Sequence, residues 1–330
     1  MSLDPATAAD VRDSLREIFA SGLALDAALT ELGWSEVLEE DAATATTLLF
    51  TEQGRALAST TALADVALAE LTDLLPAARG PRTVLFPPLR QGARPGAAGD
   101  VSGILLGSPD GEVVTPVTTA DGVGLVIVAA ESLATTPVGG FDPSSGWLRA
   151  SGHAEVSGVV PADRAWERAV AAGRRALAAE IAGVCSMALE LAVAHTTARH
   201  QYGRALGSFQ SVRHQLAECQ AAIEAARETT AVAWLAGPDE LAGPDELAGP
   251  DELAWTSALA KLRAGTTQAA VLRRTVQVLG AMGLSLESDM HRYVTRGAAL
   301  DALLGGHLRL AQEIGAAVLA GAHLRPVVMI

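Results

Sequence analysis

Apolar side chains recur at helical spacing along the first 80 residues of the chain. Over residues 4–33 they fall at steps of three and four, after an Asp-Pro pair that is typical of a helix start. The same spacing returns over residues 41–57 and 60–76, and it stops at the Gly80-Pro81 pair, which favours a turn. These patterns predict a small N-terminal helical domain over residues 1–80.

From Thr83 to about Val160 short β-type runs replace the helical spacing. The runs are rich in β-branched residues, are separated by turn sequences such as Pro-Asp-Gly, and cover residues 83–86, 102–106, 112–118 and 123–129. Gaps of turn length favour an antiparallel meander or barrel over a parallel sheet. We therefore predict a middle β domain over residues 81–160.

Helical spacing continues from residue 161 to the end of the chain. Four long stretches each carry one apolar face, over residues 162–197, 208–235, 254–281 and 288–321. Four such helices favour an antiparallel bundle, which we assign to residues 161–330. The expected fold class is mainly α with a small β domain, in the order N-terminal helices, middle β domain and C-terminal four-helix bundle.

A hexapeptide, Ala-Gly-Pro-Asp-Glu-Leu, occurs three times in succession over residues 236–253. A proline every six residues removes backbone donors and clashes with the preceding turn, so no continuous helix is expected across the repeat. Its Gly-Pro-Asp turns favour an expanded loop between two bundle helices. The six carboxylates leave a second interpretation open, an acidic docking segment.

The charge of the chain excludes several classes of function. It carries 24 basic and 38 acidic side chains, a formal net charge of −14, so a phosphate backbone would meet net repulsion and no nucleic-acid partner is expected. Cys185 and Cys219 lie in apolar helical patterns and are too few for a disulfide framework. We find neither a leader nor an uncharged apolar run of 18 residues, and expect a cytoplasmic protein with no membrane segment.

Residues 199–218 contain the densest group of candidate functional side chains. A helix is expected to end near Gly203, the chain to reverse there, and Phe209-Gln210 to open the next helix. Such a corner holds the Arg199 guanidinium and the Gln210 amide near exposed helix ends, which suits a phosphate-bearing ligand. Simple helix capping by these two side chains is the alternative.

The same segment resembles the acyl-CoA dehydrogenase family. The family signature runs Arg-x-x-(Phe/Tyr)-Gly, then Phe-Gln, then Leu-Ala, and residues 199–217 follow it in order and spacing. A second match, residues 277–283, resembles the family's Gln-x-x-Gly-Gly-x-Gly, with Ala281 in place of one glycine. Residues 287–296 then follow as in the last helices of the family. The resemblance at motif level covers about residues 160–320.

This resemblance implies FAD held between two subunits and an acyl-CoA thioester as the substrate. The residues that it places at the flavin nucleotide's pyrophosphate and neighbouring groups are Arg199, Tyr202, Phe209 and Gln210. Those that it places at the ADP end, from the opposite direction, are Gln277, Gly280 and Ala281. Small residues at the last two positions admit a close backbone approach. No metal ligand is implied.

The chain departs from the family where a catalytic base is needed. Some members of the family place a catalytic Glu nine residues after the arginine matched by Arg296, and this chain has Gly305 there. Others place the Glu 26 residues before the arginine matched by Arg199, and this chain has Gly173 there. The segment that lines the flavin ring in the family is not found in the β domain either, and Trp147 is an uncertain substitute for its tryptophan.

Other titratable side chains offer few further candidates for catalysis. Asp301, one turn before Gly305, is the only further candidate for the base. Exposed or ion-pair roles are expected for Glu180, Glu190 and Glu287, because isolated carboxylates are rarely buried. Exposed or interface positions rather than metal ligation are expected for His195, His200 and His214, which lack a carboxylate or thiolate at ligand spacing.

Three functional hypotheses follow from the resemblance. The first is a subunit of a hetero-oligomeric acyl-CoA dehydrogenase of the actinobacterial type, such as a heterotetramer, whose partner chain supplies the base and the ring-lining segment. The resemblance suggests bulky substrates, including steroid side-chain thioesters, and hence a role in lipid metabolism and steroid degradation. The second is a structural or regulatory homologue that binds no flavin. The third is a self-sufficient enzyme that uses Asp301 or another unusual base.

Overall fold

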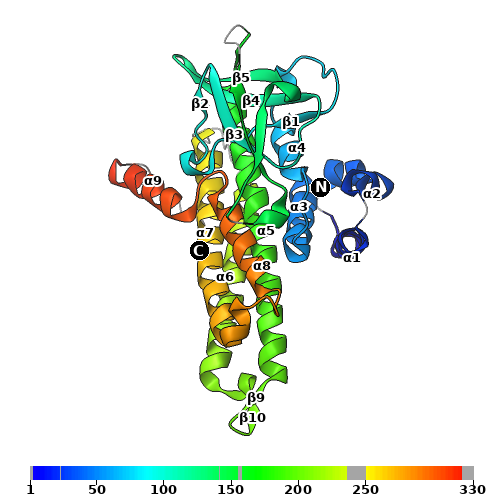
Figure 1. Cartoon of the computed structure of the whole chain (residues 1–330), viewed down its shortest axis with the longest axis vertical. Coiled ribbons are helices and arrows are strands. Elements are labelled where there is room, and N and C mark those ends of the chain that lie inside the picture. Colours follow the sequence, from blue (N-terminus) through cyan, green and yellow to red (C-terminus); the bar gives the residue numbers. More distant parts are fainter. Residues whose placement is uncertain (1–2, 23, 141, 155–157, 236–249, 322–330) are drawn as a thin grey trace. The chain divides into compact units, whose positions relative to one another are not determined.

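The computed structural model describes residues 3–22, 24–140, 142–154, 158–235 and 250–321 (Figure 1). The chain divides into two compact units built from interleaved stretches. The first unit consists of Met1–Ala58, Ala176–Trp234 and Arg263–Leu300. The second consists of Ser59–Arg175, Leu235–Leu262 and Asp301–Ile330. The boundaries predicted near residues 80 and 160 stay a prediction, because each unit draws on more than one of the three predicted domains.

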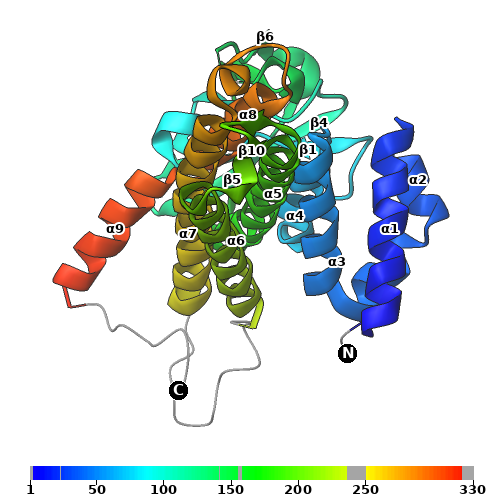
Figure 2. The same ribbon diagram turned by 90° about the horizontal axis from the view of Figure 1, so that it is seen from below.

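Three N-terminal helices belong to the first unit, namely α1 (Pro5–Ser21), α2 (Leu25–Glu31) and α3 (Trp34–Ala56). Figure 2 shows α1 and α2 beside α3. The Asp4 carboxylate caps α1 by accepting from the backbone N–H groups of Ala6 and Thr7. The single helix expected over residues 4–33 is wrong, because the chain leaves α1 at Gly22, whose φ is 69°.

The rest of the first unit is made of bundle helices. It contains the C-terminal parts of α5 (Asp163–Ala198) and α7 (Pro250–Leu279), almost all of α6 (Gln210–Leu235) and most of α8 (Met290–Ala302). These parts lie side by side (Figures 1 and 2). The start of α7 lies four residues before the predicted one, within the third hexapeptide, with a proline at the first helical position. Residues 236–249 of the predicted repeat loop lie outside the described residues.

The helix expected over residues 288–321 is two helices, which corrects the sequence interpretation. After α8 the chain turns through residues 303–306, and α9 (His307–Leu319) follows. Leu304 has a φ of 55° and Gly305 a φ of 107°, both in the left-handed region that interrupts a helix.

Helix α5 is long and apolar enough to cross a membrane by length and composition, and it is the one such helix among the described residues. Within its most apolar window of 18 residues, 78% are buried inside the protein. This burial is typical of the central helix of a folded core.

Glycines bring α3 and α5 into backbone contact within the first unit. A Cβ atom at Gly54 of α3 would overlap the carbonyl oxygen of Glu180, and one at Gly183 of α5 would overlap the carbonyl oxygen of Thr51. Each helix therefore offers a glycine where the other passes, and no side chain larger than hydrogen fits at either position.

The second unit contains the two larger sheets and α4 (Ala62–Ala69). One sheet has the order β1-β4-β5-β8, with β2 also paired to β4; the other has the order β3-β7-β6. The strands are β1 (Arg82–Val84), β2 (Gly96–Ala97), β3 (Asp100–Leu105), β4 (Glu112–Thr119), β5 (Gly122–Ala129), β6 (Ala134–Pro137), β7 (Leu148–His153) and β8 (Val160–Pro161). The purely antiparallel arrangement that we predicted is wrong in part, because β1 and β2 both run parallel to β4.

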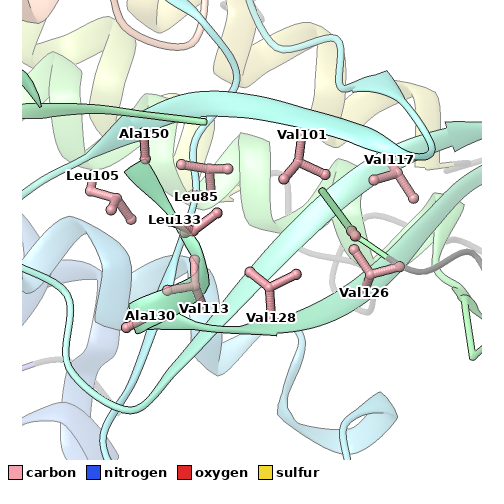
Figure 3. Packing of buried hydrophobic residues seen from close by; sticks show 11 residues of the cluster. Leu85, Val101, Leu105, Val113, Val117, Val126, Val128, Ala130, Leu133 and Ala150 are labelled. Carbon is pink, nitrogen blue, oxygen red and sulfur yellow. The ribbon is translucent and has the colours of Figure 1, made fainter. Parts of the chain in front are cut away.

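A compact apolar core joins the two sheets of this unit. Side chains of β3, β4 and β5 point toward one another in Figure 3, among them Val101, Val113 and Val128. Ala150 of β7, in the same sheet as β3, and Leu133, just before β6, complete the cluster. The β-branched alternation that predicted strands is thus used on one inward face of each strand. The predicted fold class, mainly α with a small β domain, is confirmed.

Candidate functional site

A tight hairpin connects α5 to α6 at the place where the sequence predicted a chain reversal. Strands β9 (His200–Gln201) and β10 (Arg204–Ala205) pair antiparallel, and they lie beyond the ends of the two helices (Figure 1). The two residues between them, Tyr202 and Gly203, have φ values of 54° and 77°. Two successive left-handed residues match the twist of a two-residue hairpin, which explains why glycine follows the tyrosine.

Aromatic and cationic side chains are stacked on this hairpin. The Tyr202 ring, which is 91% exposed, stands edge-on to the Phe209 ring at 6.2 Å between centroids. The Arg204 guanidinium lies over the same Phe209 ring, with its central carbon 4.0 Å from the ring centroid. A cation over an aromatic face is attracted by the ring quadrupole, so Phe209 holds Arg204 at the base of the hairpin.

Arg199 lies between the end of α5 and the hairpin, and its backbone ties the two together. Its N–H donates to the carbonyl of His195, and its carbonyl accepts from the N–H of Leu206, both at 2.8 Å. Its guanidinium is exposed and makes no hydrogen bond or ion pair with any residue that the structure describes. Gln210, also exposed, is the first residue of α6. Both polar groups are therefore available to a ligand.

The hairpin region is cationic in an acidic protein. Residues 191–217 contain three arginines and three histidines and no aspartate or glutamate, whereas the whole chain has a net charge of −14. Such a local excess of positive charge attracts an anion over short range, where the distant acidic groups are screened.

The second predicted segment lies at the end of α7, in the same compact unit. Gln277, Gly280 and Ala281 are all exposed, and Gly280 has a φ of 64° where α7 gives way to the short 3-10 helix Gly280–Leu284. Figure 1 shows this turn, between α7 and α8, toward the end of the bundle that carries β9 and β10. All seven predicted flavin-binding residues therefore lie in one unit and none is buried, although no contact between the two groups is observed.

The two positions that the resemblance assigns to a base are both enclosed in the second unit. A Cβ atom at Gly173 would lie 2.7 Å from Cδ1 of Leu304, which leaves no room for a side chain without movement. One at Gly305 would lie 3.2 Å from Cδ2 of Leu310, and the φ of 107° disfavours any residue with a Cβ. Neither position holds a side-chain proton acceptor. A carboxylate at Gly173 would require the Leu304 side chain to move, and one at Gly305 would be strained by the backbone conformation.

A buried group of charged side chains surrounds Gly305, and the sequence interpretation missed it. Asp301 accepts from His307 twice, at 3.1 Å from its N–H and 2.7 Å from Nδ1. Lys261 Nζ donates to the carbonyl of Asp301 at 2.8 Å and lies 3.8 Å from its Oδ1. Arg174 Nε donates to the carbonyl of Leu304 at 3.1 Å. Asp301, our further candidate for the base, is therefore engaged.

The remaining carboxylates behave largely as expected. Glu190 pairs with Arg55 at 2.8 Å, and this hydrogen bond lowers the pKa of the Glu190 carboxyl. Glu180 is buried beside Arg296, whose guanidinium lies 3.7 Å away and also donates to the carbonyl of Ala58. Glu287 is exposed. Glu190 and Glu180 therefore have structural roles in ion pairs.

No other reactive or metal-binding group was found in the part of the chain that the structure describes. It contains no cluster of three or more metal-ligating side chains. His200 Nδ1 lies 3.1 Å from the carbonyl of Ala198, and His214 is exposed. Cys185 and Cys219 are free and buried, and burial raises the pKa of both thiols. Trp147 is buried in the second unit.

Comparison with protein families places the helical half of the chain. Residues 164–319 match the family model of the acyl-CoA dehydrogenase C-terminal domain. The chain is 31% identical over 236 residues to the acyl-CoA dehydrogenase FadE34 of Mycobacterium tuberculosis, which covers 69% of this chain and 30% of that protein. It is 30% identical over 129 residues to the acyl-CoA dehydrogenase IpdE2 of Mycolicibacterium smegmatis, covering 39% and 37%. The chain spans about a third of the length of these curated relatives.

Solved structures resemble the chain over nearly its whole length. A variant of the Tcur3481-Tcur3483 steroid ACAD is 26% identical with a TM-score of 0.73, covering 96% of this chain and 98% of that one. The ChsE4-ChsE5 complex from Mycobacterium tuberculosis is 20% identical, with a TM-score of 0.73 and coverage of 98% and 99%. A glutaryl-CoA dehydrogenase from Mycobacterium smegmatis in complex with FADH2 is 15% identical, with a TM-score of 0.72 and coverage of 98% and 97%. The last two likenesses concern the fold alone.

Proposed function

Because this chain belongs to the acyl-CoA dehydrogenase family, we propose that it is one subunit of an FAD-dependent acyl-CoA dehydrogenase whose second subunit is another chain of the same family. The reaction is the α,β-dehydrogenation of an acyl-CoA thioester. The flavin, when bound, accepts the β-hydrogen as hydride. The α-proton must leave to a base, and we assign that base to the partner chain.

The exposed Arg199 guanidinium is the observation that carries the flavin-binding part of the proposal. It has no partner among the described residues, it stands in the cationic stretch 191–217, and Gln210 opens α6 close behind it in the chain. A pyrophosphate suits this donor set, because a guanidinium fork and helix N-terminal N–H groups both bind phosphate oxygens. Gln277, Gly280 and Ala281 would receive the ADP end from the opposite direction.

The enclosed glycines support the assignment of the base to a partner. Gly173 and Gly305 hold no acceptor, and Asp301 is already occupied by His307 and Lys261. Its two carboxylate oxygens already accept from His307, and Oδ1 also lies 3.8 Å from Lys261 Nζ, so neither oxygen is free to face a substrate. The hypothesis of a self-sufficient enzyme that uses Asp301 is therefore the weaker one.

One solved relative suggests the nature of the partner and of the substrate. The Tcur3481-Tcur3483 protein, which is 26% identical to this chain, combines two different chains and is described as a steroid ACAD. We propose a hetero-oligomer of the same kind, with a bulky CoA thioester such as a steroid side-chain one as its substrate. A cytoplasmic location, expected from the sequence, belongs to the proposal too.

Flavin content of the assembled complex tests this function. The chain is co-expressed with an acyl-CoA dehydrogenase-like partner, purified, and examined for the flavin absorbance spectrum. Arg199→Ala should weaken flavin binding about ten- to a hundredfold, because a charge-assisted hydrogen bond is worth about 1.5–3 kcal/mol. The matched control is Arg263→Ala, which removes an exposed arginine on α7 that has no side-chain partner among the described residues.

A colourless complex would instead favour a structural or regulatory homologue. Unchanged flavin affinity in Arg199→Ala would remove the residue from the binding site. The chain without its partner, offered acyl-CoA thioesters and an electron-accepting dye, should show no turnover, because a missing general base typically costs about 10²–10⁴-fold in rate. Robust turnover by the single chain would contradict the shared-site proposal.

A further inference from the structure

The chain contains a single lysine, and this lysine is entirely buried. Among the 24 lysine and arginine residues only residue 261 is lysine, and its exposed fraction is 0%. Surface positions that usually carry lysine are filled by arginine throughout. The one compact ammonium group therefore sits where its size and its three donors matter, rather than where it would aid hydration.

Lys261 and its neighbours satisfy the backbone groups that two helix ends leave open. The last carbonyls of a helix have no partner within it, and Lys261 Nζ donates to that of Asp301 in α8 at 2.8 Å. It also donates to the carbonyl of Gly305, in the turn after α8, at 3.4 Å. The Asp301 carboxylate accepts from the N–H of His307, the first residue of α9. A positive group thus caps the end of α8 and a negative group the start of α9, as the helix dipoles favour.

Four elements meet at this turn. Arg174 comes from α5, Lys261 from α7, Asp301 from α8 and His307 from α9, and the first three are buried. Burial lowers the pKa of Lys261 to about 8, and the neighbouring Asp301 charge opposes the shift while Arg174 adds to it. Burial likewise lowers the pKa of Arg174 to about 10. Asp301 therefore offsets part of the cost of burying Lys261, whereas the charge that opposes the shift of Arg174 is that of Glu313.

We infer that Lys261, Asp301 and Arg174 form a structural joint that holds the turn between α8 and α9 closed at the place where the family resemblance puts the catalytic carboxylate. This inference rests on the proposed function, and it adds that the chain's own site of proton abstraction is blocked as well as lacking a base. Lys261 is the positioning residue of the joint. Proton abstraction is left to the partner chain for that reason.

The single lysine provides a probe of the joint. An amine reagent such as trinitrobenzenesulfonate reacts only with an unprotonated amine that solvent reaches, and no other side chain of this protein carries one. Modification of Lys261 in the full chain is followed by peptide mass spectrometry, beside an unstructured lysine peptide. We expect Lys261 to react at least about a hundredfold more slowly than the peptide, because reaction requires a local opening.

Asp301→Asn should raise the reaction rate of Lys261 about tenfold or more, because it removes the charge that holds the joint together. The matched control is Asp289→Asn, which changes an exposed aspartate just before α8 whose side chain pairs with Arg292. If Asp301→Asn does not fold, Arg174→Met serves in its place, with Arg168→Met as its control, since Arg168 pairs with Glu70 near the surface.

The pH dependence reports the burial of the reacting amine, and the comparison of Asp301→Asn with Asp289→Asn reports the joint. The reaction rate of wild-type Lys261 should stop rising above about pH 8. The rate of the free peptide should keep rising with pH up to the lysine pKa of 10.5. Reaction of wild-type Lys261 at the rate of the peptide, or equal rates in Asp301→Asn and Asp289→Asn, would overturn the joint. Because the assay needs neither flavin nor acyl-CoA, a flavin-free complex refutes the proposed function alone.

Discussion

The hairpin after α5 and the joint before α9 use positive charge in opposite ways. At the hairpin Arg199 is exposed and unpaired among the described residues, and Arg204 is held only by the face of Phe209. At the joint Lys261 and Arg174 are buried and each donates to a backbone carbonyl. An exposed cation can still bind an anion, whereas the donors of a buried cation already make hydrogen bonds within the fold. Only the first arrangement is open to a ligand.

The largest expected effect comes from removing the ammonium group of the joint. Lys261→Ala leaves the Asp301 carboxylate buried without its cation and two carbonyls without a donor. Breaking a buried pair in this way typically costs about 3–5 kcal/mol of unfolding free energy. Urea denaturation measures it, with Arg263→Ala as the exposed control on the same helix. A loss below 1 kcal/mol would show that the joint contributes little.

The pH dependence of stability gives the next largest effect. The pKa of Lys261 is about 8 in the folded chain and 10.5 in the unfolded chain. Between pH 8 and pH 10.5 the unfolded state therefore binds more protons than the folded state. Stability from this group therefore rises with pH, by about 2 kcal/mol from pH 8 to 9.5 at about 1.4 kcal/mol per pH unit. Denaturation at several pH values should show this gain in the wild type and not in Lys261→Met. Parallel curves would contradict it.

A change at the hairpin should affect flavin binding more than stability. Gly203→Ala forces a Cβ into a left-handed conformation with a φ of 77°, at a cost of about 1–2 kcal/mol, but removes no charge. Flavin retention by the complex should fall several-fold, and the strain should lower the melting temperature of the variant by only about a few degrees. Gly315→Ala, at a helical glycine with open space around it, is the control. Unaltered flavin retention would separate the hairpin geometry from binding.

The smallest effect is expected from the hexapeptide segment. Deleting residues 236–247, two of the three copies, should change the unfolding free energy by about 1 kcal/mol or less, because loop closure depends only weakly on length. Thermal melting and size-exclusion chromatography of the complex measure this. Failure to assemble would favour the other interpretation of the repeat, an acidic docking segment.

The hairpin could be predicted from sequence because its determinants are local. Gly203 marks the turn, and α6 begins at Gln210, the residue expected to open the helix. The flavin-binding roles themselves remain predictions. Local signals also explain the errors: the apolar spacing continues through Leu303 and Leu304, and this concealed the break that Gly305-Gly306 introduces between α8 and α9.

The joint could not be predicted from spacing because its members come from four separate elements. Lys261 looks like an ordinary surface residue of an amphipathic helix, and its partners lie 40 and 44 residues further along the chain. The parallel pairing of β1 with β4 was missed for the same reason, since nothing near either strand records its neighbour. The composition held one usable signal, the presence of a single lysine among so many arginines.

The crossing of α3 and α5 has a consequence for reading genetic selections on this protein. Gly54 and Gly183 admit no side chain, because a Cβ at either would overlap a carbonyl oxygen of the other helix. In a saturation mutagenesis library every substitution at these codons should be depleted, whatever activity is selected. Depletion at these two positions would therefore report helix packing. Residues needed for activity would be those whose substitutions are tolerated in an abundance screen but fail in an activity screen.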